Sequence, residues 1–493
     1  MVSRRFFVSG LLSGLAGAGW AEPLARSPFP APRPEGLAKR AAPGIDTLIA
    51  RTGLSGKVGF VVADAKTGAV LEAHNPVLKL PPASTTKAIT AMYGLKTLGS
   101  GYRFVTRVLA TGPVQAGIVQ GDLVLQGSGD PALDTDQLAD LAARLRAAGV
   151  RGVSGKFIYD DRALPHLKSI DPGQPEHVGY NPAISGLNLN FNRVHFEWKP
   201  ASSGWAVTMD ARAKRYRPQV QVARMKVVNR QVPIYTYADA KGADQWTVAS
   251  GALGKGGSRW LPVRRPGEYA AEVFQTLARA QGISLPRAQR AKTAQSGTEL
   301  ARHQSAPLSD ILRGMLKYST NLTAEVVGMS ASRRRGGTGA SLSASAGQME
   351  DWLKATLGPR HAKFVDHSGL GDGSRISANE MNRALLAAAP DGALKGLMKD
   401  VPMRDAKGKV VKGSPIKIKA KTGTLNFVSS LAGYVTTPKG RELTFAIFTA
   451  DTSKRAQLSR SERERPEGGR SWARRSRGLQ AQLVDRWATV YEL

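Results

Sequence analysis

The feature that most constrains the fold is a change of pattern that occurs twice along the chain. From Lys57 to Glu72 two apolar runs flank a turn with a glycine, which predicts a β-hairpin, and Thr85 to Leu98 has the apolar spacing of a helix. From about Tyr102 to Pro266 the chain shows many short β-like runs with scattered glycines instead. Helical periodicity then returns, so we expect the two ends to form one domain and the middle to be an insertion.

After the insertion the pattern predicts three helices, then antiparallel strands, and finally a helix that lies across the sheet. The sequence therefore predicts an α/β chain of the α+β type. In chain order the ranges are Glu268–Ala280, Leu308–Gly328 and Met349–Leu357 for the helices, Ile416–Ala420, Leu431–Val435 and Leu443–Ala450 for the strands, and Leu479–Tyr491 for the last helix.

Length and charge limit the classes of function. The 493 residues are enough for two to four domains, and 70 Lys and Arg against 38 Asp and Glu give a formal charge of +32, which favours acidic partners. We expect no nucleic acid, because zinc-ligand spacing, an aromatic RNA-binding motif and a basic region with heptads are all absent. Anionic cell-wall polymer or peripheral contact with a membrane surface remain. The chain has no cysteine, which excludes disulfides and thiol catalysis.

The N-terminus has the pattern of an export signal. Arg4 and Arg5 precede an apolar run from Phe6 to Trp20, and Ser3–Phe7 resembles a twin-arginine signal. Residues 1–21 are therefore predicted to be a signal peptide; the alternative is an uncleaved anchor. A periplasmic location is expected.

Ser84-Thr85-Thr86-Lys87 is the first motif with a chemical meaning, and it lies at the start of a predicted helix. Ser84 and Lys87 share one helical face. A serine hydroxyl needs an adjacent base to become a nucleophile, and a lysine amine can act as that base when burial and nearby cations lower its pKa. Taken alone, the pattern is more often a helix cap followed by a solvated lysine.

Tyr318-Ser319-Thr320-Asn321 is the second motif, and it opens or interrupts a helix far downstream. Ser319 has a hydroxyl for relaying a proton between nucleophile and leaving group. Asn321 offers a carbonyl and an amide, which suit a substrate peptide bond. By itself this motif is also more often an ordinary polar helix start.

Lys421-Thr422-Gly423-Thr424 is the third motif. Alternation places Lys421 on the same face as Lys417 and Lys419, which predicts a polar face open to a cleft. Gly423 allows a substrate backbone to approach, and an edge strand there pairs with an extended peptide. The alternative is a basic edge strand that prevents aggregation, which leaves the Thr-Gly-Thr unexplained.

The three motifs in this order are typical of class A β-lactamases and penicillin-binding proteins. The long interval between Ser84 and Ser319 resembles that of the low-molecular-mass class C penicillin-binding proteins, the D-alanyl-D-alanine carboxypeptidase/endopeptidase family, which carries an inserted domain there. Further segments that resemble this family are Gly121–Leu123, Gly127–Leu133, Tyr159–Asp161, Leu187–Asn190 and Asp366–Leu370.

The resemblance implies a fold, a domain arrangement and an activity. It implies a transpeptidase-like domain, an antiparallel sheet flanked by helices plus a helical cluster, formed by residues 22–101 and 266–493, with a large β-rich insertion at 102–265. It also implies hydrolysis of D-alanyl bonds in peptidoglycan stem peptides through an acyl-enzyme, with β-lactams as inhibitors. No cofactor and no metal are implied.

Roles for the motif residues also follow from the resemblance. Ser84 is similar to the family's nucleophile, Lys87 to its base and Ser319 to its proton shuttle. The backbone N–H groups of Ser84 and Thr424 would form the oxyanion hole, and positive charge on Lys421 would help to keep Lys87 neutral. The residues expected to bind substrate are Asn321, Lys421, Thr422, Gly423 and Thr424.

The chain departs from the family at one recognition position. The family often has an Arg after Ser-Gly-Leu-Ser that reads the diaminopimelate side chain together with an Asp of the insertion. Here Gly371 and Asp372 follow Ser-Gly-Leu, and the nearest Arg is Arg375. An acid at this place repels a free carboxylate. Asp160 or Asp161 is expected to bind an ammonium group.

Two further features have ordinary interpretations. Arg455–Arg477 mixes Arg with Glu, Ser and Gly, which predicts a solvated, mobile loop; the alternative is an electrostatic tether to anionic murein. His361 and His367 have no metal-ligand spacing and are expected to be structural or on the surface.

Two other functions compete with the peptidase. One is a β-lactamase or esterase that uses the same nucleophile, which steady turnover of penicillin would reveal. The other is a cell-wall-binding protein with an inactive site, against which the intact Ser84, Lys87, Ser319 and Lys421 argue.

Overall fold

The structure is a computed structural model that describes residues 43–337, 340–358, 361–405 and 408–492. The predicted signal peptide, residues 1–21, and the leader that follows it lie outside these ranges. Residues Gly44–Leu493 form one compact unit. Within the described ranges, every helix is too short or too polar to cross a bilayer.

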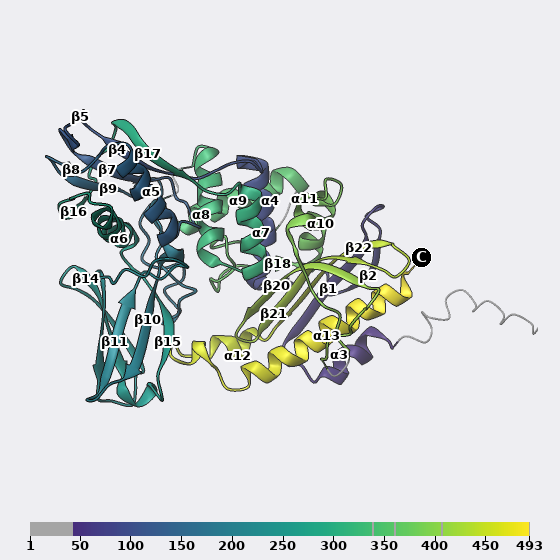
Figure 1. Ribbon diagram of the computed structural model, residues 1–493. Helices are drawn as coiled ribbons and strands as arrows, with labels where there is room; N and C mark the ends of the chain where they lie inside the picture. The colour runs from purple at the N-terminus through teal and green to yellow at the C-terminus, as the bar shows by residue number, and fades with distance from the viewer. Residues whose placement is uncertain (1–42, 338–339, 359–360, 406–407, 493) are drawn as a thin grey trace, which may run out of the picture. The chain divides into compact units, whose positions relative to one another are not determined.

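A six-stranded antiparallel sheet joins the two ends of the chain (Figure 1). The predicted hairpin is present, and its first strand pairs with the last strand of the chain, from Lys57 opposite Ala450 to Asp64 opposite Leu443. The α+β class is therefore confirmed. The strand order is β19 (Lys399–Asp400), β20 (Lys417–Leu425), β21 (Val428–Thr436), β22 (Glu442–Ala450), β1 (Lys57–Asp64) and β2 (Val70–His74).

Helices cover both faces of this sheet because strands such as β21 and β22 are buried along nearly their whole length. On one face lie α3 (Ile45–Thr52) and α13 (Gly469–Val490), whose Trp487 ring is 5.5 Å from the ring of Phe60. On the other face lies α10 (Ala378–Ala388) (Figure 1). The final helix crosses the sheet as predicted and begins ten residues earlier than expected.

A cluster of helices next to α10 carries residues of the first two sequence motifs. At its centre is α4 (Thr86–Leu98), in which Thr86 to Gly94 are all buried, so this helix is enclosed by its neighbours. Around it pack α7 (Leu308–Tyr318), α8 (Asn321–Arg334) and α9 (Leu342–Leu357). The positions of these helices were predicted, except that one helix was expected over Leu308–Gly328. The single continuous range was wrong, whereas the expectation that Tyr318–Asn321 opens or interrupts a helix is confirmed, because Ser319 takes a left-handed conformation, with φ 61°, and divides the segment.

The middle of the chain forms a second hydrophobic core with residues from Val108 to Ala301. It contains the predicted short strands and also α5 (Thr135–Ala147), which was not predicted although Asp134 and Gln137 form a capping box at its start. Helix α6 (Pro266–Ala280), which follows the predicted insertion in the chain, packs in the same core. The limits 102–265 for the insertion stay a prediction. The sheets are β16-β9-β7-β4-β17, β11-β10-β15 and β12-β14-β13, with β4 Val105–Ala110, β7 Leu123–Gly127, β9 Phe157–Asp160, β10 Arg193–Pro200, β11 Trp205–Asp210, β12 Ala223–Val228, β13 Tyr235–Ala240, β14 Ala243–Ala249, β15 Gly257–Pro262, β16 Ala288–Arg290 and β17 Thr298–Gln304.

The segment Arg455–Arg477 is folded, so the prediction of a solvated, mobile loop was wrong. It includes the end of α12 (Thr452–Ala456), a short 3-10 turn at Glu462–Glu464 and the first turns of α13. Trp472 is buried there and its ring lies 6.1 Å from the ring of Phe427. The buried apolar residues between the arginines are what hold the segment against the domain.

Candidate active site

Ser84 lies at the tip of α4, in the 3-10 turn Ala83–Thr85. The turn is fixed by the Thr85 hydroxyl, which donates to the Pro82 carbonyl at 2.6 Å, while Ala83 has a left-handed φ of 47°. Ser84 remains partly exposed although its neighbours are buried. The strained turn therefore presents one hydroxyl to a cleft from an otherwise buried helix end.

Lys87 lies one helical turn after Ser84 and is fully buried. Its Nζ is within hydrogen-bonding distance of three oxygens: Ser84 Oγ at 3.0 Å, Asn321 Oδ1 at 2.7 Å and the Ser368 carbonyl at 2.7 Å. The first two motifs of the sequence thus meet at one nitrogen.

Burial lowers the pKa of Lys87 to about 8, while the carboxyl groups of Glu325 and Asp366 act in the opposite direction. The lowered pKa agrees with the expected neutral amine. Of the two predicted causes, burial is the main one, since loss of water lowers the pKa most. Lys421 is itself fully buried, and both burial and the nearby Lys87 hold its pKa well below the usual range.

Two buried carboxyl groups near Lys87 were not singled out by sequence reasoning. Glu325 accepts hydrogen bonds from the backbone N–H groups of His367 and Ser368, both at 2.9 Å, and burial raises its pKa to about 8. Asp366 accepts from two backbone N–H groups, and burial also raises its pKa. A sequence signal exists, because Glu325 lies four residues after Asn321 on α8 and therefore on the same face.

The second motif lies at the junction of α7 and α8. Asn321 donates its Nδ2 to the carbonyl of Tyr180 at 2.9 Å, so its side chain is held from both sides by Lys87 and the middle of the chain. Ser319 Oγ accepts from Lys421 Nζ at 3.0 Å. The second and third motifs are therefore also in contact.

The third motif is in β20, next to a free strand edge. Strand β21 pairs with all of β20, whereas β19 pairs only with Lys419 and Ala420, so the other edge from Lys421 to Leu425 faces the cleft. Lys421 is buried, so the expectation that its side chain shares an open polar face with Lys417 was wrong. Thr424, in contrast, is exposed.

Gly423 is where β20 approaches the turn that carries Ser84. A Cβ built at this position would lie 2.1 Å from Ser430 Oγ and 2.9 Å from both the Pro82 carbonyl oxygen and the Ser84 backbone nitrogen. Only glycine therefore fits between the strand and the turn.

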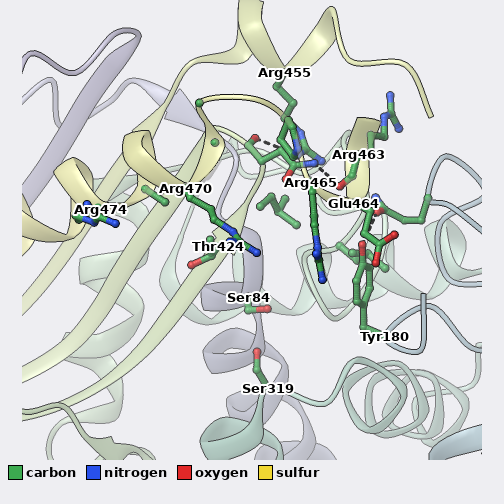
Figure 2. A pocket seen from close by; sticks show the side chains of 18 of the residues that line it. Ser84, Tyr180, Ser319, Thr424, Arg455, Arg463, Glu464, Arg465, Arg470 and Arg474 are labelled. Atoms are coloured by element: carbon green, nitrogen blue, oxygen red, sulfur yellow. Dashed lines mark hydrogen bonds between the residues drawn. The ribbon is translucent and has the colours of Figure 1, made fainter. Parts of the chain in front are cut away.

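These residues border a cleft of about 1100 Å³. Ser84, Ser319, Asn321 and Thr424 line it together with Tyr180, and one wall consists of the arginine-rich segment before and within α13 (Figure 2). Lys87 and Lys421 lie beneath the lining. The described residues include no group of three or more His, Asp or Glu side chains arranged to hold a metal ion; His367 is fully buried and His361 is exposed.

Asp160 and Asp161 are not brought into the lining of this cleft. Asp160 is buried and forms an ion pair with Arg162 at 2.8 Å, and Asp161 is buried and paired with Arg290 at 2.8 Å. Their expected role in ammonium binding stays a prediction.

Asp372 is neutralised by two arginines rather than left to repel a carboxylate. It forms an ion pair with the buried Arg455 and lies 3.5 Å from the guanidinium of Arg463. The expected repulsion was wrong, because no local pattern indicates that the distant Arg455–Arg463 segment folds back onto this residue.

Comparisons with known proteins agree with the geometry. A family model described as the D-Ala-D-Ala carboxypeptidase 3 (S13) family matches residues 42–465. The D-alanyl-D-alanine carboxypeptidase of Actinomadura sp. (strain R39) is 29% identical over 454 residues, covering 84% of this chain and 82% of that protein. The D-alanyl-D-alanine carboxypeptidase DacB of Haemophilus influenzae is 26% identical over 440 residues, covering 82% and 89%.

A solved structure shows the same fold. Penicillin binding protein 4 (dacB) from Haemophilus influenzae superposes with a TM-score of 0.69 at 23% identity, covering 86% of this chain and 98% of that one. The chain therefore has the penicillin-binding fold that the motif order implied.

Proposed function

The chain belongs to the D-Ala-D-Ala carboxypeptidase 3 (S13) family, and on this basis we propose that Ser84 is its nucleophile. The protein is a serine-type hydrolase of D-alanyl bonds in peptidoglycan. The observation that carries the assignment of Ser84 is the set of three oxygens around Lys87 Nζ.

A neutral lysine amine has two N–H bonds and one lone pair. The two short contacts, to Asn321 Oδ1 and the Ser368 carbonyl, are both to acceptors and take the two N–H bonds. The lone pair is then directed at the Ser84 hydroxyl, 3.0 Å away. Lys87 accepts the hydroxyl proton as Ser84 Oγ attacks the carbonyl carbon of the penultimate D-alanine.

The backbone N–H groups of Ser84 and Thr424 stabilise the negative oxygen that forms in this step. Support comes from the close approach of β20 to the Ser84 turn at Gly423. The substrate binds as an extended strand along the free edge of β20, and its terminal carboxylate is held by the hydroxyl groups of Thr422 and Thr424 beside Lys421.

Ser319 passes its proton to the departing D-alanine amine, which leaves with the electron pair of the broken C–N bond. Ser319 then receives the proton that Lys87 took from Ser84, so Lys87 is neutral again. The contact of Ser319 with Lys421 orients the hydroxyl for that transfer. Water then attacks the ester on Ser84 and gives a proton to Lys87. Lys87 returns that proton to Ser84 Oγ as the ester C–O bond breaks, which releases the shortened peptide and free Ser84. A β-lactam acylates Ser84 by the same attack and is released slowly.

Labelling with a fluorescent penicillin tests this assignment. We expect one adduct, on the peptide that contains Ser84, and its loss in Ser84→Ala. Ser343→Ala, the same change at an exposed serine of α9, should label as wild type. Labelling elsewhere would overturn the assignment, and rapid release of hydrolysed penicillin would favour the β-lactamase alternative.

We also propose export to the periplasm by the N-terminal signal, with association to peptidoglycan through the basic surface. The support is the Arg4-Arg5 apolar segment and the charge of +32. Penicillin-labelled protein should be released when the outer envelope is opened osmotically. Labelled protein retained with a cytoplasmic marker would contradict the proposal, and retention with the membrane would favour an uncleaved anchor.

A further inference from the structure

One wall of the active-site cleft presents arginines on a single helix face. Arg470, Arg474 and Arg477 are at positions i, i+4 and i+7 of α13, so their side chains follow one stripe along that helix. Arg465 precedes the helix. All four are exposed, and all four line the same cleft as Ser84. Figure 2 shows Arg465 and Arg470 extending from the ribbon into the space above Ser84.

The other charged groups of this wall already have partners. Arg455 and Arg463 are paired with Asp372, and Arg460 lies 2.7 Å from Glu176. Glu464 lies 2.8 Å from the guanidinium of Arg259 and 2.7 Å from the ring of His177. Across the ranges that the structure describes, no ion pair is formed by Arg465, Arg470, Arg474 or Arg477.

Packing of α13 fixes the direction in which its arginine-bearing face points. Its opposite side buries Trp472, Leu479 and Trp487 against the sheet, which fixes its rotation. Like charges four residues apart repel each other and reduce the stability of a helix. An anion in the cleft relieves that repulsion, and the guanidinium group is suited to grip a carboxylate with two hydrogen bonds.

We propose that Arg465, Arg470, Arg474 and Arg477 form an anion subsite that binds free carboxylates of the stem peptide upstream of the cleaved D-alanyl bond. The proposal rests on the proposed function and adds a preference among its substrates. We assign the bound anion to the substrate, because the four arginines line the same cavity as Ser84. A membrane surface cannot enter such a cleft.

Two synthetic peptides ending in D-Ala-D-Ala test the subsite, one with free upstream carboxylates and one with the same groups amidated. The quantity measured is the ratio of their kcat/KM values. For wild type we expect about a tenfold preference for the acidic peptide, the effect of two arginine–carboxylate pairs of ordinary strength. The preference should appear in KM and should disappear near 1 M salt, where screening acts within about 3 Å.

The variant R470Q/R474Q should lower the ratio of the two kcat/KM values to about 1. A matched control is R475Q/K439Q, which also removes two charges. Arg475 is on the same helix but donates to the carbonyl of Gly53, Lys439 is in a turn, and neither lines the cleft. The control should keep the wild-type ratio.

Failure of the subsite and failure of the proposed function give different results. If Ser84 labels with penicillin and the amidated peptide is cleaved, a wild-type ratio of 1 overturns the subsite alone. An equal fall in the control would assign the effect to bulk charge and also overturn it. A third outcome would assign the arginines to a phosphate polymer instead. In that case the wild-type ratio of kcat/KM values is 1, and polyphosphate inhibits cleavage of both peptides equally in wild type but not in R470Q/R474Q. Loss of labelling and of all cleavage would contradict the proposed function.

Discussion

The surroundings of Lys87 favour its uncharged amine, but they do not lower its pKa so far that the amine can no longer accept a proton. Burial disfavours the ammonium form, whereas the carboxyl groups of Glu325 and Asp366 partly restore it, which leaves its pKa at about 8. A base with a pKa near the working pH combines a useful neutral fraction with the strength to take a proton. The two buried carboxyl groups therefore adjust the base rather than contact substrate.

The dependence of kcat/KM on pH tests the role of Lys87. Only the neutral amine accepts a proton from Ser84, and its fraction increases as the pH rises through the pKa. We therefore expect kcat/KM for a D-Ala-D-Ala peptide to rise with pH and level off above an apparent pKa of about 8. A profile that is flat from pH 6 to pH 9 would rule out Lys87 as the base.

Glu325→Gln should move this rising limb to lower pH. Glu325 raises the pKa of Lys87, so removal of its charge makes the neutral amine available sooner. Glu467→Gln, at an exposed position, is the control and should leave the limb in place. The amount of penicillin label per protein reports folding of the variant. A shift to higher pH in folded Glu325→Gln would contradict this account.

Gly423→Ala should separate the strand from the nucleophile. The new Cβ would meet the Pro82 carbonyl and the Ser84 nitrogen, both backbone atoms, so the turn must move. Displacement of one oxyanion-hole donor lowers kcat by about 10²- to 10³-fold, and we expect that loss for peptide cleavage and penicillin acylation.

The control for this change is Gly347→Ala, in the interior of α9, where a Cβ would meet nothing within 4 Å. It should retain wild-type activity and gain about 1 kcal/mol in the free energy of unfolding, because alanine favours a helix over glycine. Wild-type activity in Gly423→Ala would show that the oxyanion hole is formed elsewhere.

At the scale of elements, periodicity was a good guide wherever one face of an element is buried. It located α4, the strands β20 to β22 and the end of α13. It failed where backbone conformation or distant contacts decide. The left-handed Ser319 that divides α7 from α8 leaves no periodic signal, and only the polar motif Tyr318–Asn321 indicated an interruption there. Trp472 among arginines gives no hint that Phe427 covers it. The motif residues were recognisable because their spacing is local, whereas Glu325 and Asp366 were missed because only the fold buries them beside Lys87.

Trp487→Ala tests how much α13 contributes to the sheet domain. Its ring is fully buried, 5.5 Å from the ring of Phe60 and 5.9 Å from that of Phe445. Removal of such a side chain costs about 3–5 kcal/mol in the free energy of unfolding, measured by denaturant titration. Thr489→Ala, on the exposed side of the same helix, should change it by less than about 0.5 kcal/mol. Equal effects of the two changes would show that α13 is only loosely docked.

At the scale of the whole molecule, the two ends of the chain meet in one sheet and the middle adds a second core beside the cleft. Ser84 and Lys87 come from the first part, Ser319 and Asn321 from the helices after the middle segment, and Lys421 from the last sheet strands. Tyr180 of the middle segment also lines the cleft, and its carbonyl accepts from Asn321. The cleft is therefore complete only when all three parts are folded.

The formal charge of +32 should give the protein an affinity for isolated, anionic peptidoglycan sacculi that is separate from catalysis. We expect co-sedimentation at low salt that falls steeply as salt rises, because the screening length shortens from about 10 Å at 0.1 M to about 3 Å at 1 M. Ser84→Ala should sediment as wild type does, since the attraction involves the surface as a whole. R470Q/R474Q should weaken sedimentation no more than R475Q/K439Q does, because both remove two of the charges. Binding that persists unchanged at 1 M salt would show that specific contacts, rather than charge, hold the protein on the wall.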